Sequence, residues 1–513
     1  MIHESGPPSM RGPPRLRSPL AIGAIALIPI AVLFLLGGQF AHLAGILLLL
    51  LLILFPLMHI LLRRRHRELL SKSEDKDEEP SGDAPSCSPV AQRLVEPPQT
   101  KPSILGPLKN PIFRSLWLAS LVSGSAVSAQ DTALRWVMSG LSASSLLLSA
   151  ISTLTFLAFC LLTLPAGMAA DRIDRRRILK IINLLLAAAS GLLTMFALLQ
   201  GITPTIILVF AFILACGVAT TAPAWTALMP EVVEEKYWPA VSALGGVQLN
   251  LSGIVGPAIG GFMIPAFGTS IVFGLAAAGF LLLAWTVRAS RSRGSRSPAE
   301  GRKTWSTLIR ELINVITSQR PIQIVIARNV LFSLFISVIP TLLPVIGLKV
   351  LRLDSTGLGL LFTSLGIGAV VGGFWLVPVA KARLSANGVT IFASVMLGLT
   401  YFLMGCIRHP WFFMLVAGIG GAAWTLAAAE LWAAGLYTAT AGLRGRVNAI
   451  LMVVANAGLV VGGLFWGTMP DRYGIDATLH VASIALLCSL PLLFWLSIDF
   501  KGASGGAESN PSS

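Results

Sequence analysis

The chain has 513 residues, of which 55% are hydrophobic and only 12% are charged. Soluble domains carry about twice that charged fraction, and apolar runs of about 20 residues, each long enough to cross a bilayer as a helix, recur along most of the chain. These runs are continuously apolar, which excludes the alternating pattern of a membrane β-barrel. The sequence therefore predicts an all-α polytopic membrane protein.

The net charge of +15 does not indicate nucleic-acid binding. The basic residues lie in short segments between apolar runs, as the positive-inside rule predicts, so we expect a lipid bilayer and no nucleic acid as partner. The five cysteines are scattered, form no metal-binding spacing and suggest no disulfide set. We expect neither a metal nor a cofactor.

The first hundred residues fall into three segments. Residues 1–18 contain several Pro and Arg residues and are expected to be disordered. Residues 19–62 form an apolar block with a Gly-containing break, which predicts a hairpin of two transmembrane helices. Basic residues flank this block on both sides and place both of its ends in the cytoplasm. Residues 63–106 are charged and rich in Pro, Gly and Ser, which predicts a disordered cytoplasmic linker.

Two blocks of six apolar spans follow, at 107–289 and 322–498. A basic, Ser-rich segment, 290–321, joins them and is expected to be a cytoplasmic loop, and 499–513 is expected to be a cytoplasmic tail. Two six-helix bundles of nearly equal length indicate a duplicated transporter. The predicted spans are 113–139, 144–168, 178–199, 203–226, 240–264, 268–289, 322–347, 355–379, 387–407, 411–436, 447–469 and 476–498.

A dense polar turn separates the second and third of these spans. Six charges fall within the seven residues from Asp171 to Arg177, and Gly167 precedes them. This spacing resembles the signature loop of the major facilitator superfamily. The resemblance implies a cytoplasmic gate. In this gate Gly167 permits close packing, and Asp171 sits against the N-terminus of the eleventh membrane span, where the helix dipole favours an anion. An ordinary basic anchor loop is the alternative. The predicted gating residues are Gly167, Asp171, Arg172, Arg175, Arg176 and Arg177.

The fifth span contains Gly256-Pro257 followed by Gly260-Gly261. This pattern resembles the antiporter motif of the exporters in the same superfamily. Proline removes a backbone donor and bends a helix, and the glycines let backbones approach closely. Simple packing is the alternative, and it would still place a bend where the two bundles meet.

Further segments resemble the enterobactin-exporter-like branch of the superfamily, also called transmembrane secretion effectors. They include "PAWTALMPEVV", "GLGLLFTSLGIGAVVGG", "RGRV" and "GLFWGTMPDRYG". The resemblance covers about 107–498 and implies the 12-helix major facilitator fold, to which the N-terminal hairpin is an addition. Gly253 stands where this branch often has Arg.

Ionisable residues within the spans are candidates for function, because each costs about 2.5–3.5 kcal/mol to insert. Asp131 and Arg135 lie four residues apart on one helix face, which predicts an ion pair. The superfamily resemblance implies that spans one, four, seven and ten line the cavity. Asp131 and Glu430 are therefore candidate proton-coupling residues, with Arg135 as the partner that holds Asp131, and Gln130 and Asn250 are candidates for binding polar groups of the substrate. Glu430 has no basic residue within four positions on its helix, so we expect Glu430 to take up a proton more readily than Asp131 does. A structural ion pair and a snorkelling Glu430 are the alternatives.

Together these features predict a monomeric secondary active transporter in the bacterial cytoplasmic (inner) membrane. It would export a small amphipathic compound, such as a siderophore, drug or secondary metabolite, in exchange for protons by alternating access. The chain has no GxxxxGK[ST] sequence, so the energy must come from an ion gradient. A lysophospholipid flippase and a non-transporting sensor or scaffold are the alternatives. The six histidines are dispersed, and we expect no enzymatic activity.

Overall fold

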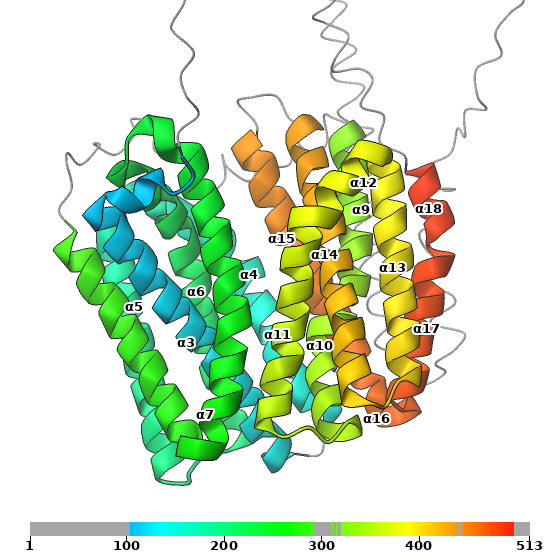
Figure 1. The fold of residues 1–513 in the computed structure, drawn as a ribbon, viewed down its shortest axis with the longest axis horizontal. Coiled ribbons are helices and arrows are strands. Elements are labelled where there is room, and N and C mark those ends of the chain that lie inside the picture. Colours follow the sequence, from blue (N-terminus) through cyan, green and yellow to red (C-terminus); the bar gives the residue numbers. More distant parts are fainter. Residues whose placement is uncertain are drawn as a thin grey trace, which may run out of the picture. The chain divides into compact units, whose positions relative to one another are not determined.

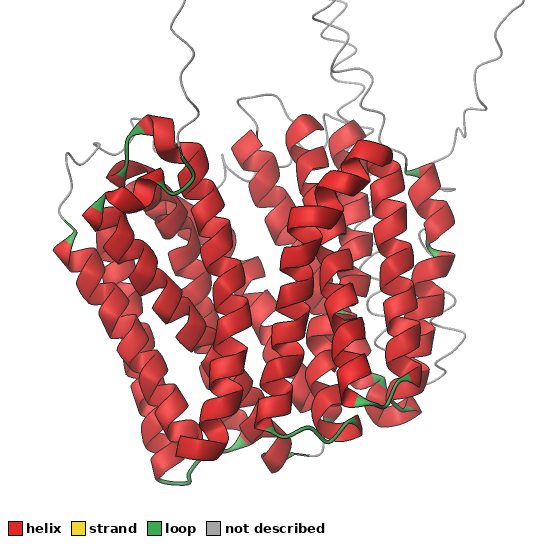
Figure 2. Cartoon of the chain, viewed as in Figure 1, coloured by secondary structure: helices red, strands yellow, loops and turns green. Residues whose placement is uncertain are grey.

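The computed structural model describes residues 103–142, 144–290, 320–438 and 444–496, and the single residues 310, 314 and 316. Several predicted segments lie outside the described residues: the N-terminal tail (1–18), the hairpin (19–62), nearly all of the linker (63–106), most of the central loop (290–321) and the C-terminal tail (499–513). Every element of regular secondary structure that the structure describes is a helix (Figure 2). The all-α prediction is confirmed.

The N-terminal bundle begins after a short 3-10 helix, η2 (Gly106–Lys109). It consists of α3 (Pro111–Leu141), α4 (Ser145–Arg172), α5 (Arg175–Leu198), α6 (Pro204–Val232), the 3-10 turn η3 (Glu235–Tyr237) and α7 (Trp238–Ala289). The first four α-helices each begin at a polar residue whose side chain accepts a hydrogen bond from the first turn: Asn110, Ser144, Asp174 and Thr203. Such caps satisfy backbone N–H groups that have no partner within the helix, which explains why the helices start where they do.

Helix α7 makes two membrane crossings. A straight helix of its 52 residues would be about 78 Å long, more than twice the hydrocarbon thickness of about 30 Å. Gly268 has φ 80 and ψ 167, which is outside the helical region, and the chain turns back there (Figure 1). Among the described residues, eleven helices are long and apolar enough to span a membrane. With the two crossings of α7, they supply the twelve predicted spans.

The C-terminal bundle is built from shorter pieces. They are α9 (Arg320–Ile336), α10 (Val338–Val345), the π-helical turn η4 (Ile346–Val350), α11 (Ser355–Val371), the π-helical turn η5 (Gly372–Leu376), α12 (Val377–Arg383), α13 (Ala386–Cys406), α14 (Pro410–Thr438), α15 (Arg444–Thr468), α16 (Pro470–Tyr473), α17 (Ile475–Cys488) and α18 (Leu490–Trp495). Consecutive pieces combine into single crossings, for example α9 to η4 and α11 to α12.

The paired bundles have two ends, which are defined by the connections between helices. The signature-turn end holds the connections 173–174, 233–237 and 384–385, and the far end holds the connections 142–144 and 351–354. The far end, with α16 and the turn of α7, lies at the lower edge of Figure 1.

Candidate functional site

The predicted ion pair between Asp131 and Arg135 forms within α3. Arg135 Nε lies 2.9 Å from Asp131 Oδ2, and Arg135 Nη2 donates to Asp131 Oδ1 at 3.2 Å. The two side chains differ in exposure, because that of Arg135 is 6% exposed and that of Asp131 is 40% exposed. The guanidinium is thus fixed in protein, while the carboxylate keeps a surface that a proton or a ligand can reach.

Arg135 also connects the two bundles. Its Nη1 donates to Ser152 Oγ of α4 at 2.9 Å, and that hydroxyl donates to the Pro340 carbonyl oxygen of α10 at 2.6 Å. The guanidinium carbon lies 5.3 Å from the centre of the Phe362 ring of α11, within the range of a cation–π contact. Asp131 therefore sits beside the interface of the bundles, one helical turn closer to the signature-turn end than Arg135.

The two candidates for binding polar groups of the substrate form their hydrogen bonds within the N-terminal bundle. Gln130 is buried, and its Oε1 accepts a hydrogen bond from Ser190 Oγ of α5 at 3.0 Å, so the side chain lies inside the N-terminal bundle. Successive helical residues differ by about 100° in direction, so Gln130 cannot share the face of Asp131. Asn250 is exposed, but its Nδ2 donates to the Gly246 carbonyl oxygen of its own helix at 2.8 Å.

Glu430 of α14 is paired with a cation from another helix, which corrects the expectation based on its own helix. Lys381 Nζ of α12 lies 3.1 Å from Glu430 Oε2, and the Glu430 side chain is only 10% exposed. The fully buried Arg328 of α9 also interacts electrostatically with this carboxylate, and its Nη1 donates to Asn387 Oδ1. Packing between helices therefore supplies a cation that the Glu430 helix itself lacks.

The basic residues of the signature turn bind within the N-terminal bundle. Arg175 forms an ion pair with Glu231 and donates to the Ala227 carbonyl oxygen at 3.2 Å, which ties α5 to the end of α6. Arg176 Nη1 donates to Ser290 Oγ at 3.1 Å. Arg177 is exposed, and the side chain of Arg172 is outside the described part of the chain.

Where their side chains are described, the predicted gating residues form no hydrogen bond or ion pair with the C-terminal bundle. Asp171 is exposed and has no hydrogen bond or ion pair with the residues that the structure describes. A Cβ added at Gly167 would meet no atom within 4 Å, so the close packing expected for this glycine is absent in this state. Asp174 instead caps α5, because its carboxylate accepts from the Arg176 backbone N–H at 3.0 Å.

The antiporter-like motif packs against both bundles. Cβ atoms added at Gly256 and Gly260 would overlap the backbone of α3, at 2.5 Å and 2.8 Å from the nearest atoms. A Cβ at Gly261 would lie 2.6 Å from the Ser355 carbonyl oxygen of α11, and the Pro257 carbonyl also touches α11. The motif is therefore a close-packing surface at the bundle interface.

Helices α7 and α11 contact each other in the middle of the bundles and at the far end. Thr363 Oγ1 donates to the Ile254 carbonyl oxygen at 2.8 Å, and Gly366 packs on the same turn of α7. Cβ atoms added at Gly245 and Gly246, two turns closer to the signature-turn end, would meet nothing within 4 Å. On the α4 side, Leu164 still packs against an apolar cluster of the C-terminal bundle. The polar contacts between the described parts of the bundles thus lie in the middle and at the far end.

Sequence reasoning missed a set of polar contacts between the bundles at the far end. The Asp471 carboxylate of α16 accepts hydrogen bonds from the first turn of α4, and Lys349 lies beside it. Asp471 belongs to the segment "GLFWGTMPDRYG", which was read only as a family resemblance. The available signal was the Ser-rich start of α4. This run of capping residues has no acidic residue near it in the sequence, so a carboxylate from elsewhere could bind there.

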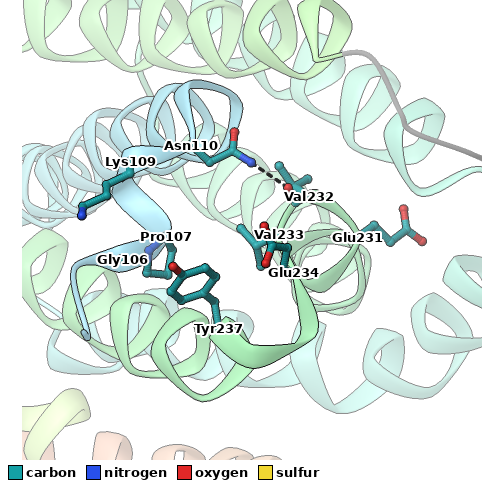
Figure 3. A pocket seen from close by; sticks show the side chains of 9 residues that line it. All are labelled: Gly106, Pro107, Lys109, Asn110, Glu231, Val232, Val233, Glu234 and Tyr237. Carbon is teal, nitrogen blue, oxygen red and sulfur yellow. Dashed lines mark hydrogen bonds between the residues drawn. The ribbon is translucent and has the colours of Figure 1, made fainter. Parts of the chain in front are cut away.

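A pocket of about 480 Å³ opens at the signature-turn end of the N-terminal bundle, between η2, η3 and the end of α6 (Figure 3). Asn110 bridges one of its walls by donating to the Val232 carbonyl oxygen at 2.9 Å. About 30 Å of helix rise separates Asn110 from Asp131, so this pocket is distinct from the ion-pair site. The described residues contain no group of three or more His, Cys, Asp or Glu side chains that could hold a metal ion.

Comparison with known families gives two matches. Residues 102–510 match the family described as transmembrane secretion effector. Residues 25–77, in the predicted hairpin and linker, match a family described only as a protein of unknown function.

Similar proteins of known name are efflux pumps. The multidrug efflux pump Tap of Mycolicibacterium fortuitum is 24% identical over 377 residues, which are 72% of this chain and 91% of that protein. Macrolide efflux protein A of Streptococcus pyogenes is 21% identical over 389 residues, which are 73% of this chain and 93% of that protein.

Solved structures of transporters share the fold. The nucleoside transporter NupG superposes with a TM-score of 0.59 and 13% identity, over 75% of this chain and 99% of that one. The D-xylose-proton symporter gives a TM-score of 0.61 and 13% identity, over 76% and 99%. The predicted 12-helix architecture is confirmed.

Proposed function

Because the chain belongs to the transmembrane secretion effector family, a branch of the major facilitator superfamily, we propose that it exports small amphipathic compounds in exchange for protons. Secondary active efflux is supported by the fold and by the efflux pumps among its relatives. The chain is a multi-pass membrane protein. We place it in the cytoplasmic membrane of a bacterium with the signature-turn end and both termini inside, because basic residues concentrate at that end.

Transport would proceed by rocking of the two bundles about the Asp131–Arg135 site. In the state described here, polar contacts hold the bundles together at the far end, and none forms between the described residues of the signature turn and the C-terminal bundle. In the opposite state the far-end contacts would open, and Asp171 would reach the N-terminus of α15. Such rigid-body alternation around a fixed midplane site is the usual behaviour of repeat-built transporters.

The observation that carries the coupling proposal is the unequal exposure of the two charges in the pair. Arg135 is held by Ser152 and Phe362, so it stays in place when Asp131 loses its charge. The half-exposed Asp131 carboxylate would then bind either a proton or the cationic group of a substrate, but not both. Competition for one carboxylate is sufficient to couple outward substrate movement to inward proton movement. Glu430, paired with Lys381, is a second candidate for the same role.

For the substrate we propose lipophilic compounds with a positive charge. A cation is the natural ligand of the half-exposed Asp131 carboxylate, and Phe362 lies next to the pair as an apolar and π-rich surface. The named activities of the relatives, multidrug and macrolide efflux, are compatible with this class.

Accumulation assays in a bacterium that lacks its own major drug pumps test this proposal. Cells that express the chain should accumulate less of a fluorescent lipophilic cation than cells with an empty vector, and a protonophore should abolish the difference. Asp131→Asn should behave like the empty vector at equal expression. Asp476→Asn is the control, because Asp476 pairs with Arg408 within the C-terminal bundle and should leave efflux unchanged. Equal accumulation with and without the parent protein would contradict the proposal.

A further inference from the structure

We propose that Asp471 is the latch of the far-end gate: its carboxylate, carried by the C-terminal bundle, holds the N-terminus of α4 in the N-terminal bundle. The latch keeps the far end closed until the bundles rock apart. This inference rests on the alternating access proposed above and assigns a residue to one of its two gates.

The latch is a set of hydrogen bonds between bundles. Both carboxylate oxygens of Asp471 accept from the Ser145 backbone N–H at 3.0 Å, and Oδ2 also accepts from the Leu146 N–H at 3.3 Å. The Ser144 hydroxyl donates to Oδ2 at 3.2 Å. Ser144 is itself the N-cap of α4, so the helix start carries a cap from its own chain segment and a second one from the other bundle.

The first turn of a helix favours such a ligand. Its N–H groups have no partner within the helix, and the helix dipole places positive potential there. Helix α4 has 28 residues, so this potential is fully developed. A carboxylate satisfies the free donors and the potential at once, whereas the neutral amide of Asn can satisfy only part of the hydrogen bonding. Asp471→Asn therefore removes the charge and part of the hydrogen bonding while it keeps the size of the side chain.

Lys349 completes the latch from the end of the seventh crossing. Its Nζ donates to Ser145 Oγ at 2.9 Å and lies 3.9 Å from Asp471 Oδ1. The side chains of Lys349 and Asp471 are 26% and 37% exposed. Because water can reach both charges, they can separate without entering an apolar environment, which suits a contact that opens in each cycle.

Buried contacts between the bundles lie next to the latch, on the side toward the middle of the bundles. Ser149, one turn further along α4, donates to the Thr341 carbonyl oxygen at 3.1 Å, and Cβ atoms added at Gly463 or Gly467 of α15 would collide with this face of α4. Thr341 is fully buried and its hydroxyl has no hydrogen-bond partner. A side chain at position 341 can therefore meet solvent only when the far end opens.

The latch has a counterpart at the other end of the same two crossings. Asp171 near the end of α4 is proposed to reach the N-terminus of α15, and Asp471, shortly after the end of α15, binds the N-terminus of α4. The start of each of these two helices would thus be capped by an aspartate that lies at or just after the end of the other helix. Rocking of the bundles would make one cap while it breaks the other, so the two aspartates would bias the equilibrium in opposite directions.

The test uses Thr341→Cys as a reporter of far-end opening, in full-length protein whose native cysteines are replaced. Purified protein in detergent is treated with a thiol-reactive fluorophore, so that membrane orientation does not matter. Asp471→Asn should raise the labelling rate about two- to thirtyfold, the range expected for the loss of a negative charge at a helix N-terminus. Lys349→Met should raise it less, because the carboxylate keeps its backbone donors. It also provides a second latch variant if Asp471→Asn does not fold.

The matched control is Asp476→Asn, which removes another far-end carboxylate whose partner, Arg408, belongs to the same bundle. This variant should label at the parent rate. Equal labelling of the parent, Asp471→Asn and Lys349→Met would overturn the latch, and so would an equal increase in the Asp476→Asn control. The readout is conformational and needs no substrate, so a failed export assay with a positive labelling result would reject the proposed substrate class and leave the latch intact.

Discussion

Gly261→Ala should force the far end of the bundles apart. The added Cβ would lie 2.6 Å from the Ser355 carbonyl oxygen, 0.8 Å short of the 3.4 Å at which ordinary contact begins. It would also lie 3.1 Å from the Cα of Gly359, so no flexible side chain can yield. Helix α11 must therefore move away from α7, and overpacking of this kind costs about 1–3 kcal/mol. The cost falls only on the state with a closed far end.

A cost of that size shifts a two-state equilibrium by about five- to 150-fold toward the open far end. If the bundles move as rigid bodies, the opening at α7 and α11 also uncovers the opposite side of the interface, so labelling of Thr341→Cys should accelerate by a similar factor. Gly253→Ala, on the same helix, is the control, because its Cβ would meet nothing within 4 Å. Labelling of Gly261→Ala at the rate of Gly253→Ala would refute the rigid-body account of the gate.

Three further substitutions have distinct expected outcomes. Glu430→Gln should lower the thermal-unfolding midpoint more than Lys381→Gln does. Loss of the Glu430 carboxylate leaves the exposed Lys381 free to turn to water, but it leaves the buried Arg328 without the negative charge near it. Equal midpoints for the two variants would contradict this reasoning. Asp171→Asn should slow export and also slow labelling of Thr341→Cys, because it removes the latch of the opposite state, and faster labelling would reverse its proposed role. Asp174→Ala should destabilise the protein by about 1 kcal/mol through loss of the α5 cap, without changing the labelling rate.

Much of the fold follows from the sequence because the bilayer restricts the choices. A spanning segment must be helical and about 20 residues long, so the apolar runs alone locate the twelve crossings. The merged helix α7 illustrates the point: the predicted spans 240–264 and 268–289 meet at Gly268, the one residue of α7 with non-helical dihedral angles. Local chemistry was also readable, because the Asp131–Arg135 pair depends only on helical spacing.

Contacts between helices were not readable in the same way. Glu430 was assigned no cation because the nearest one, Lys381, is 49 positions away in the chain and reaches it through packing of α12 on α14. Asp471 and the start of α4 are more than 320 residues apart. Gln130 and Asn250 were chosen by residue type, but the direction of each side chain is set by helix rotation, which a single sequence does not determine. The sequence thus predicts which segments meet the bilayer better than which side chains meet each other.

Proton-driven, uphill transport in proteoliposomes tests the central claim most directly. The substrate is a permanently charged fluorescent cation, which cannot accumulate simply by becoming protonated, and protein-free vesicles give the background. Vesicles with an acidic lumen should accumulate the cation, because protons leave in exchange for it. Asp131→Asn should lose both this accumulation and downhill exchange of the cation, because the same carboxylate is proposed to bind the proton and the cation. Accumulation by Asp131→Asn at the parent level would contradict the role of Asp131, and equal accumulation by the parent protein with and without the pH gradient would contradict proton-coupled export.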